Sequence, residues 1–180
     1  QIYEIQGKEE LAFENYSEVL KSNPGYELFF HADLNKSGVK KMETDEDIKK
    51  ASKYYRRLLS EEKNWEFRDK IYYEMALFEI KRGTYPNALN YLGESVQVST
   101  SNPVQKAYSY LKMGEIYHDR YKDYEKAAAY YDSTMQVMPP DTKNYENVKK
   151  TAENLKVFVK HLTTVKEQDR LLELKEMPEE

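Results

Sequence analysis

The sequence predicts an all-α fold in which helical hairpins stack into a solenoid. The main observation is a spacing that recurs four times: an alanine, a residue four positions later, another after three more, and a closing position five beyond. The alanines that begin the copies are 39, 37 and 39 residues apart: Ala12, Ala51, Ala88 and Ala127. Self-similarity at such a period is typical of stacked supersecondary units. The second observation is that no strand signal is longer than an apolar tripeptide.

The composition agrees with a repeat protein that has a thin core. Of 180 residues, 39% are hydrophobic and 33% charged, which is polar for a globular domain but typical of a solenoid whose layers bury little. The net charge of −4 gives no reason to expect nucleic acid or an anionic membrane as a partner. The chain has no cysteine, which excludes disulfides and thiolate metal sites, and no apolar run that could span a bilayer. Because the chain begins with Gln1, in what reads as mid-repeat, we expect a processed or excised piece.

Helix pairs follow from the apolar spacing and from the Gly and Pro residues that punctuate it. The first pair is truncated, because residues 1–24 contain a turn at Gly7 and one helix that Asn23-Pro24-Gly25 ends. The helices of the later pairs are expected over 26–34 with about 45–60, 65–82 with 85–98, and 103–120 with 124–137. Gly83-Thr84 is the expected turn of the third pair, and Pro103 suits the first turn of a helix.

Two N-caps are expected from side-chain oxygens that precede helical segments. Thr44 or Asp45 should cap the second helix of the second pair, and Asp141 or Thr142 should cap a final helical region. A side-chain oxygen at such a position accepts hydrogen bonds from the free backbone amides of the first turn. The acidic residues after Thr44 also suit the positive end of the helix dipole.

The final region has an apolar stripe that alternates three and four residues apart and should pack one face on a neighbour. Thr164 with Glu167 resembles a capping box, so we expect a break near Thr163 and a second helix to about Met177. The resulting division is 1–140 for about three and a half hairpins, 141–177 for a C-terminal cap of one helix or a helix pair, and 178–180 for a frayed tail.

Two of the repeats resemble the tetratricopeptide repeat, which has an aromatic residue, Leu-Gly and Tyr in its first helix, and Ala, an aromatic residue and Pro in its second. The close match consists of Tyr110, Met113-Gly114, Tyr117, Ala127, Tyr131 and Pro139. A weaker match consists of Tyr72, Met75-Ala76 and Ala88, with Glu79 where Tyr is usual. The resemblance implies a tetratricopeptide-type solenoid, in which small residues let paired helices approach closely and aromatic rings fill the holes between layers.

A narrower resemblance covers about residues 7–177. The segments that carry it are 64–73, 105–117, 129–134 and 168–172. Together their order is similar to the repeat region of the gliding-motility and type IX secretion lipoproteins of the SprE/PorW type. This resemblance implies a periplasmic, outer-membrane-associated scaffold that supports protein export, with a lipid anchor outside these residues. Arg170 departs from the family, which tends to have Ser there, and the stretch 35–44 has no counterpart.

One stretch of the second pair has the beginning of a calcium-binding loop. Asp33–Gly38 supplies alternating oxygen ligands and a glycine at the sharp turn. The remainder fails, because Lys40 stands where an apolar anchor is expected and Glu43 comes one residue early. We therefore expect a polar inter-helix loop over 35–44 and no metal site.

No constellation of residues indicates catalysis, so we expect no enzyme and no cofactor. His31, His118 and His161 are far apart in sequence, and no serine lies in a Gly-x-Ser-x-Gly context. His118 has Glu115 and Asp119 nearby to orient it, but no nucleophile accompanies it. One predicted helix is strongly basic, which a solvated face explains more simply than an acidic partner: Lys49, Lys50, Lys53, Arg56 and Arg57.

The 17 tyrosines are the most useful clue to binding. Core positions are expected at Tyr16, Tyr55, Tyr110, Tyr117 and Tyr131. Other residues lie on the first helices of the pairs, which would line a concave groove: Tyr73, Leu77, Ile80, Lys81, Tyr108, Leu111, Glu115 and His118. Tyrosine is enriched at interfaces because its rigid ring adds contact area while its hydroxyl stays hydrogen-bonded. Packing between layers would explain these positions equally well.

Three functions remain open at this point. The first is a non-catalytic scaffold of the secretion and motility apparatus that binds another protein or a peptide, such as an envelope secretion subunit. The second is a generic adaptor or chaperone-like module that holds an extended peptide, for which cations should line the groove, and only Lys70 and Lys81 stand near it. The third is a regulatory repeat module of a cell-wall enzyme.

Overall fold

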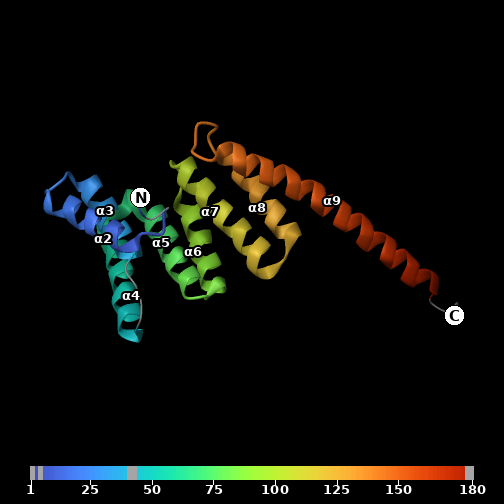
Figure 1. The fold of residues 1–180 in the computed structure, drawn as a ribbon, viewed down its shortest axis with the longest axis horizontal. Coiled ribbons are helices and arrows are strands. Elements are labelled where there is room, and N and C mark those ends of the chain that lie inside the picture. Colours follow the sequence, from blue (N-terminus) through green and yellow to red (C-terminus); the bar gives the residue numbers. More distant parts are fainter. Residues whose placement is uncertain (1–2, 4–5, 40–43, 177–180) are drawn as a thin grey trace. The chain divides into compact units, whose positions relative to one another are not determined.

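The computed structural model describes Tyr3 and residues 6–39 and 44–176. In these ranges every regular element is a helix, which confirms the all-α class. The helices, labelled as in Figure 1, are α2 (Glu9–Lys21), α3 (Tyr26–Val39), α4 (Asp45–Ser60), the 3₁₀-helix η1 (Glu62–Phe67), α5 (Arg68–Lys81), α6 (Tyr85–Val98), α7 (Pro103–Ile116), the π-helix η2 (Tyr117–Tyr121), α8 (Tyr124–Val137) and α9 (Tyr145–Glu176). The chain divides into two compact units, residues 1–98 and 99–180.

The first unit contains the hairpin of α5 and α6, which turns at Gly83 with a φ of 74°. Ala76 and Ala88 are fully buried, as expected for small residues where two helices come close. The buried Ser95 hydroxyl on α6 donates a hydrogen bond to the Asp69 carbonyl oxygen on α5, at 2.8 Å. The second helix of this hairpin has the expected bounds, whereas the first begins at Arg68, because residues 65–67 belong to η1. The two helices are joined by this side-chain hydrogen bond as well as by apolar packing.

The second predicted pair does not form a hairpin. Helix α3 packs chiefly against α2, and both α3 and α4 pack against α5. The apolar cluster that joins them contains Phe30, Leu34, Tyr55, Leu58, Ile71, Met75 and Phe78. As a consequence Ala51 is only half-buried at the edge of this cluster, whereas Ala12, Ala88 and Ala127 are at most 1% exposed. The repeat spacing thus marks the packed face of each of four helices, but it predicts only some of the helix–helix pairings correctly.

Helix α3 is also longer than predicted, because residues 35–39 continue the helix instead of forming a loop. Val39 is buried at its end. Residues 40–43, which include the Lys40 and Glu43 positions, lie outside the described residues. Thr44 is the N-cap of α4, as expected: its Oγ1 accepts from the Asp47 amide at 3.1 Å, and Asp47 Oδ2 accepts from the Thr44 amide at 3.2 Å.

The second unit is built on the hairpin of α7 and α8, with α9 packed along α8 (Figure 1). Gly114 lies at the closest approach, because a Cβ atom placed on it would come within 2.9 Å of the Tyr131 ring and 3.5 Å of the Ala127 carbonyl oxygen. The close contact confirms the packing reason given for a small residue at this position. The side of α9 that meets α8 is buried through Val148, Ala152 and Leu155.

A π-helix interrupts the expected helix 103–120. Ala76 and Ala88 are 12 residues apart in the first hairpin, whereas the corresponding Gly114 and Ala127 are 13 apart. The wider turn of η2 accommodates this additional residue, since each π-turn holds one residue more than an α-turn. The chain leaves η2 through Lys122, whose φ of 53° is left-handed, and Asp123 Oδ1 then caps α8 by accepting from the Lys126 amide at 3.0 Å.

The final helix corrects two sequence predictions. Helix α9 is continuous through the expected break, and the Thr163 and Thr164 hydroxyls donate to the Val159 and Lys160 carbonyl oxygens of the same helix instead of capping a new one. It begins at Tyr145, so neither Asp141 nor Thr142 is its N-cap. Instead, these residues belong to a turn in which the Tyr145 amide donates a hydrogen bond to the Thr142 carbonyl oxygen at 3.0 Å. Met177 and the expected tail 178–180 lie outside the described residues.

Candidate functional site

The structure describes the expected groove residues in two separate sets. Tyr73, Leu77, Ile80 and Lys81 lie on α5 in the first unit, and Tyr108, Leu111, Glu115 and His118 lie on α7 and η2 in the second. Tyr108 and Leu111 pack against the apolar cluster of the second unit, so layer packing accounts for both. Three of the eight line cavities, namely Leu77 and Lys81 in the first unit and His118 in the second.

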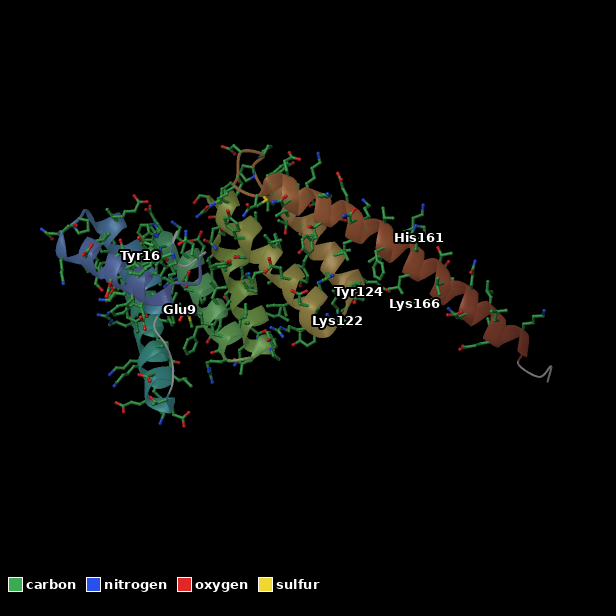
Figure 2. The ribbon with its side chains drawn as sticks, viewed as in Figure 1. Glu9, Tyr16, Lys122, Tyr124, His161 and Lys166 are labelled. Atoms are coloured by element: carbon green, nitrogen blue, oxygen red, sulfur yellow. The ribbon has the colours of Figure 1, made fainter. Side chains whose placement is uncertain are left out.

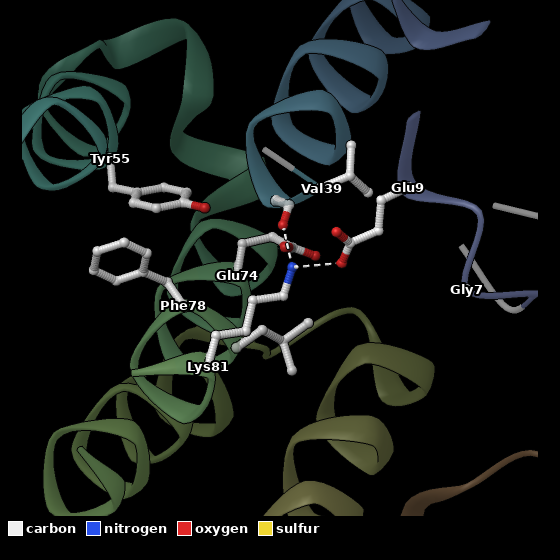
Figure 3. Close-up of a pocket in the computed structure, with 9 residues that line it drawn as sticks. Gly7, Glu9, Val39, Tyr55, Glu74, Phe78 and Lys81 are labelled. Atoms are coloured by element: carbon white, nitrogen blue, oxygen red, sulfur yellow. Dashed lines mark hydrogen bonds and ion pairs between the residues drawn. The ribbon is translucent and has the colours of Figure 1, made fainter. Parts of the chain in front are cut away.

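The cavity of the first unit has a volume of about 250 Å³ and lies between α3 and α5. Figure 3 shows the Lys81 ammonium group between these helices. Its Nζ donates to the Gly38 carbonyl oxygen at 2.6 Å and lies 3.9 Å from Glu9 Oε1. The Tyr55 hydroxyl is at the wall, where burial and then the Glu74 carboxylate raise its pKa above the ordinary value. Lys81 therefore bonds within its own unit, to α2 and α3, which makes it a poor groove cation for a partner.

The cavity of the second unit is larger, about 410 Å³, and lies where η2, α8 and α9 meet. We call it the aromatic cavity, and its lining residues are His118, Tyr124, Tyr131, Thr151, Asn154, Leu155 and Phe158. The centroids of the Tyr124 and Phe158 rings are 5.0 Å apart with planes at 78°, and those of His118 and Tyr124 are 5.4 Å apart at 72°. Successive rings are thus nearly perpendicular, and they form adjoining walls rather than one flat stack.

Two carboxylates, on α7 and η2, lie near the aromatic cavity. His118 Nδ1 is 2.6 Å from Asp119 Oδ1, so this carboxylate orients the imidazole. Burial, followed by the Glu115 and Asp119 carboxylates, raises the pKa of the Tyr131 phenol to about 12. Two carboxylates therefore lie close enough to act on a residue of the cavity.

An ion pair ties the outer part of α9 to the hairpin. Lys166 Nζ donates to Glu125 Oε1 at 2.7 Å, which joins α9 to the first turn of α8. In Figure 2 the Lys166 side chain lies on the edge of α9 that faces α8, whereas His161 lies on the opposite edge. Phe158, about two helical turns before Lys166 on the same helix, lies beside Tyr124.

Sequence reasoning found His118 but missed most of the other cavity residues. Thr151, Asn154, Leu155 and Phe158 have the spacing of one helix face, at intervals of three, one and three. That signal was present, but it lies beside the stripe of Val148, Ala152 and Leu155 that packs on α8. Which of two neighbouring stripes lines a cavity depends on how α9 is rotated against α8, and the sequence alone does not fix that rotation.

Other residues considered from the sequence have structural partners. Asp33 belongs to α3, so Asp33–Gly38 is helical and lacks the shape of a calcium loop; Asp33 Oδ2 accepts from the Tyr54 hydroxyl at 2.7 Å. His31 Nε2 is 3.0 Å from Lys70 Nζ, and burial followed by that ammonium group lowers the pKa of His31. On α4, Lys50 pairs with Glu46 at 2.8 Å, as a solvated face would.

No group of three or more His, Asp or Glu residues in residues 6–39 and 44–176 is arranged to hold a metal ion. Within the same part of the chain, none of the helices combines the length and apolar character needed to cross a bilayer. In comparisons with known proteins, no family model and no curated protein sequence matches the chain.

Proposed function

We propose that the chain is a non-catalytic scaffold of tetratricopeptide type that binds a segment of another protein. The observation that carries this proposal is the aromatic cavity, which opens between a helical hairpin and the helix that follows it. The close contact of Gly114 with Tyr131 and Ala127 supports the tetratricopeptide comparison, because it explains in this chain why a glycine stands at the crossing.

The cavity has the size and lining expected of a recognition site. Its volume of about 410 Å³ is within the range of ligand pockets, roughly 300–1,000 Å³, although it takes only a few side chains of a partner. Rigid aromatic rings contribute contact area with little loss of side-chain entropy. Asn154 and Thr151 add polar groups at the α9 side, where they are exposed to solvent and accessible to a bound chain.

A catalytic role is less well supported by the same residues. His118 and Asp119 have the orientation of a base with its orienting carboxylate, but a nucleophile should then donate to the imidazole. The Thr151 hydroxyl instead donates to the Asn147 carbonyl oxygen of its own helix at 2.9 Å. Binding therefore accounts for the cavity with fewer requirements than catalysis does.

The partner and compartment follow from the resemblance to gliding-motility and type IX secretion lipoproteins. On that basis we propose a periplasmic scaffold, associated with the outer membrane, whose partner is another subunit of the envelope secretion apparatus. The adaptor that captures a chain-terminal carboxylate is less well supported, because its two candidate cations have internal contacts. Lys81 bonds to Gly38, and Lys70 lies beside His31 and over the Phe67 ring.

Site-specific photocrosslinking in envelope extract tests the proposal. A benzophenone amino acid replaces Phe158 in the cavity or, as a matched control, Tyr121, which is an exposed ring of η2 outside the cavity lining. We expect the Phe158 probe to capture one discrete secretion subunit, identified by mass spectrometry, and the Tyr121 probe to capture none. Equal labelling at both positions, or no product at Phe158, would refute the cavity as the binding site.

A further inference from the structure

We propose that the aromatic cavity of the second unit binds a cationic side chain, lysine or arginine, of the partner segment. This inference rests on the proposed function and specifies the chemistry of the partner. It combines two features of the cavity that arise from different residues: walls made of aromatic rings, and carboxylates on the adjoining turn of helix.

The rings provide the first feature. Tyr124, Tyr131 and Phe158 come from α8 and α9, and the perpendicular arrangement of Tyr124 with Phe158 encloses a corner in which a cation can meet a ring face. A guanidinium or ammonium group is attracted to the face of an aromatic ring when it lies within about 6 Å of the ring centroid. The chain already forms such contacts internally: Lys126 Nζ lies 5.3 Å from the centroid of the Tyr117 ring in the same unit.

The carboxylates provide the second feature. Asp119, which bonds to His118 at the cavity wall, is the principal one; Glu115, about one turn earlier on α7, is already paired with Lys112. The effect of both carboxylates on the pKa of Tyr131 agrees with their closeness to the cavity. The side chain that contacts Asp119 is an imidazole rather than an ammonium group, so a bound cation would gain from its charge.

Three lysines of this unit, one each on α7, α8 and α9, are engaged in ion pairs that offset their charge. Their pairs are Lys112 with Glu115 at 2.5 Å, Lys126 with Asp123 at 3.0 Å, and Lys166 with Glu125 at 2.7 Å. An acidic side chain of a partner would meet Asp119 at close range, and a neutral apolar one would gain nothing from it. Charge complementarity therefore favours a cation over both alternatives.

The test compares three capped pentapeptides of alanine that differ only at the central residue, which is arginine, citrulline or glutamate. Citrulline has nearly the shape and hydrogen-bonding capacity of arginine without its charge. Each peptide is titrated into the full chain at low salt, and NMR follows the ring resonances of Tyr124 and Phe158. We expect the arginine peptide to bind about ten-fold more tightly than the citrulline peptide, and the glutamate peptide to bind most weakly.

Two variants and a control separate the two features. Phe158→Leu keeps an apolar side chain without a ring face, and Asp119→Asn removes a charge from an exposed side chain, so each should weaken arginine binding about three- to five-fold. Neither should alter citrulline binding by more than about two-fold. Tyr121→Leu removes an aromatic ring outside the cavity and should change nothing. If Phe158→Leu disturbs the fold, Asp119→Asn alone decides the charge contribution.

The outcomes distinguish this inference from the proposed function. Equal affinities for arginine and citrulline, a preference for glutamate, or no shift with any peptide would overturn the cation-binding inference. The binding scaffold itself would still stand if photocrosslinking at Phe158 captured a secretion subunit. If that crosslink also failed, both proposals would fall.

Discussion

The contact between Gly114 and Tyr131 predicts that an alanine at position 114 destabilises the second unit. A methyl group there would lie 2.9 and 3.1 Å from two ring carbons of Tyr131, closer than carbon atoms normally approach. Tyr131 is only 8% exposed, so moving its ring away from the methyl group would give up buried packing contacts. Overfilling a packed interior costs about 1–3 kcal/mol. Replacing glycine by alanine inside a helix gains about 1 kcal/mol in propensity.

The expected net effect of Gly114→Ala is a loss of about 1 kcal/mol, or a fall in Tm of about 4–8 °C for a unit of this size. Circular dichroism during thermal and urea denaturation measures it. Trp65, the only tryptophan of the chain, lies in the first unit and reports on that unit separately by fluorescence. Gly25→Ala is the control, because no atom lies within 4 Å of a methyl group at that glycine.

A double-mutant cycle identifies the cause. Tyr131→Leu is destabilising by itself, but it removes the ring atoms that an alanine at position 114 would meet. Gly114→Ala should therefore cost at least about 1 kcal/mol less in the Tyr131→Leu background than in the natural chain. The reasoning is refuted if Gly114→Ala stabilises the natural chain, as it would in an ordinary exposed helix, or if the two changes are additive.

Three further predictions concern single interactions. Thr44→Ala removes the capping box with Asp47 and should cost about 1 kcal/mol in urea denaturation, whereas Thr44→Ser should retain most of the stability. Ser95→Ala leaves the Asp69 carbonyl oxygen without its hydroxyl donor and should cost about 1 kcal/mol, measured in the same way, while an equal stability would show that the bond contributes nothing. The pKa of Tyr131 is about 12 in the folded chain and 10.0 ordinarily, so the folded state holds this proton more tightly. Its contribution to stability is complete below pH 10 and is lost as the pH rises toward 12, and Tyr131→Phe should reduce that alkaline loss in a pH series of denaturation curves.

The sequence predicted the helices of both main hairpins well. Residues 85–98 and 124–137 were expected as helices with the bounds that the structure has, because Gly83 and Pro139 mark the neighbouring chain reversals and the apolar spacing is regular. The N-cap at Thr44 was predicted for the same kind of reason, since the interaction is between residues three apart. Features that depend on near neighbours in sequence could therefore be predicted from the sequence.

Features that depend on tertiary packing could not be predicted from the sequence. The pairing of α3 with α2 rather than α4 depends on packing between helix faces, which the helical spacing of a single sequence does not specify. The predicted break at Thr163 is absent. A threonine hydroxyl can bond to a carbonyl group inside a helix as well as cap the start of one, and Thr163 does the former. Of the candidate site, His118 was predicted, while Tyr124 and Phe158 required the orientation of α9 against α8.

The π-helix has two roles: it joins the two helices of the hairpin, and it supplies a residue to the wall of the aromatic cavity. None of its residues, Tyr117–Tyr121, is buried, although it carries His118 at the wall of the aromatic cavity. The additional residue is accommodated before Lys122, where the chain turns into α8. Exchanges at His118 or Asp119 can thus change the preferences of the binding wall, while Tyr117 keeps its packing against the interior of the hairpin.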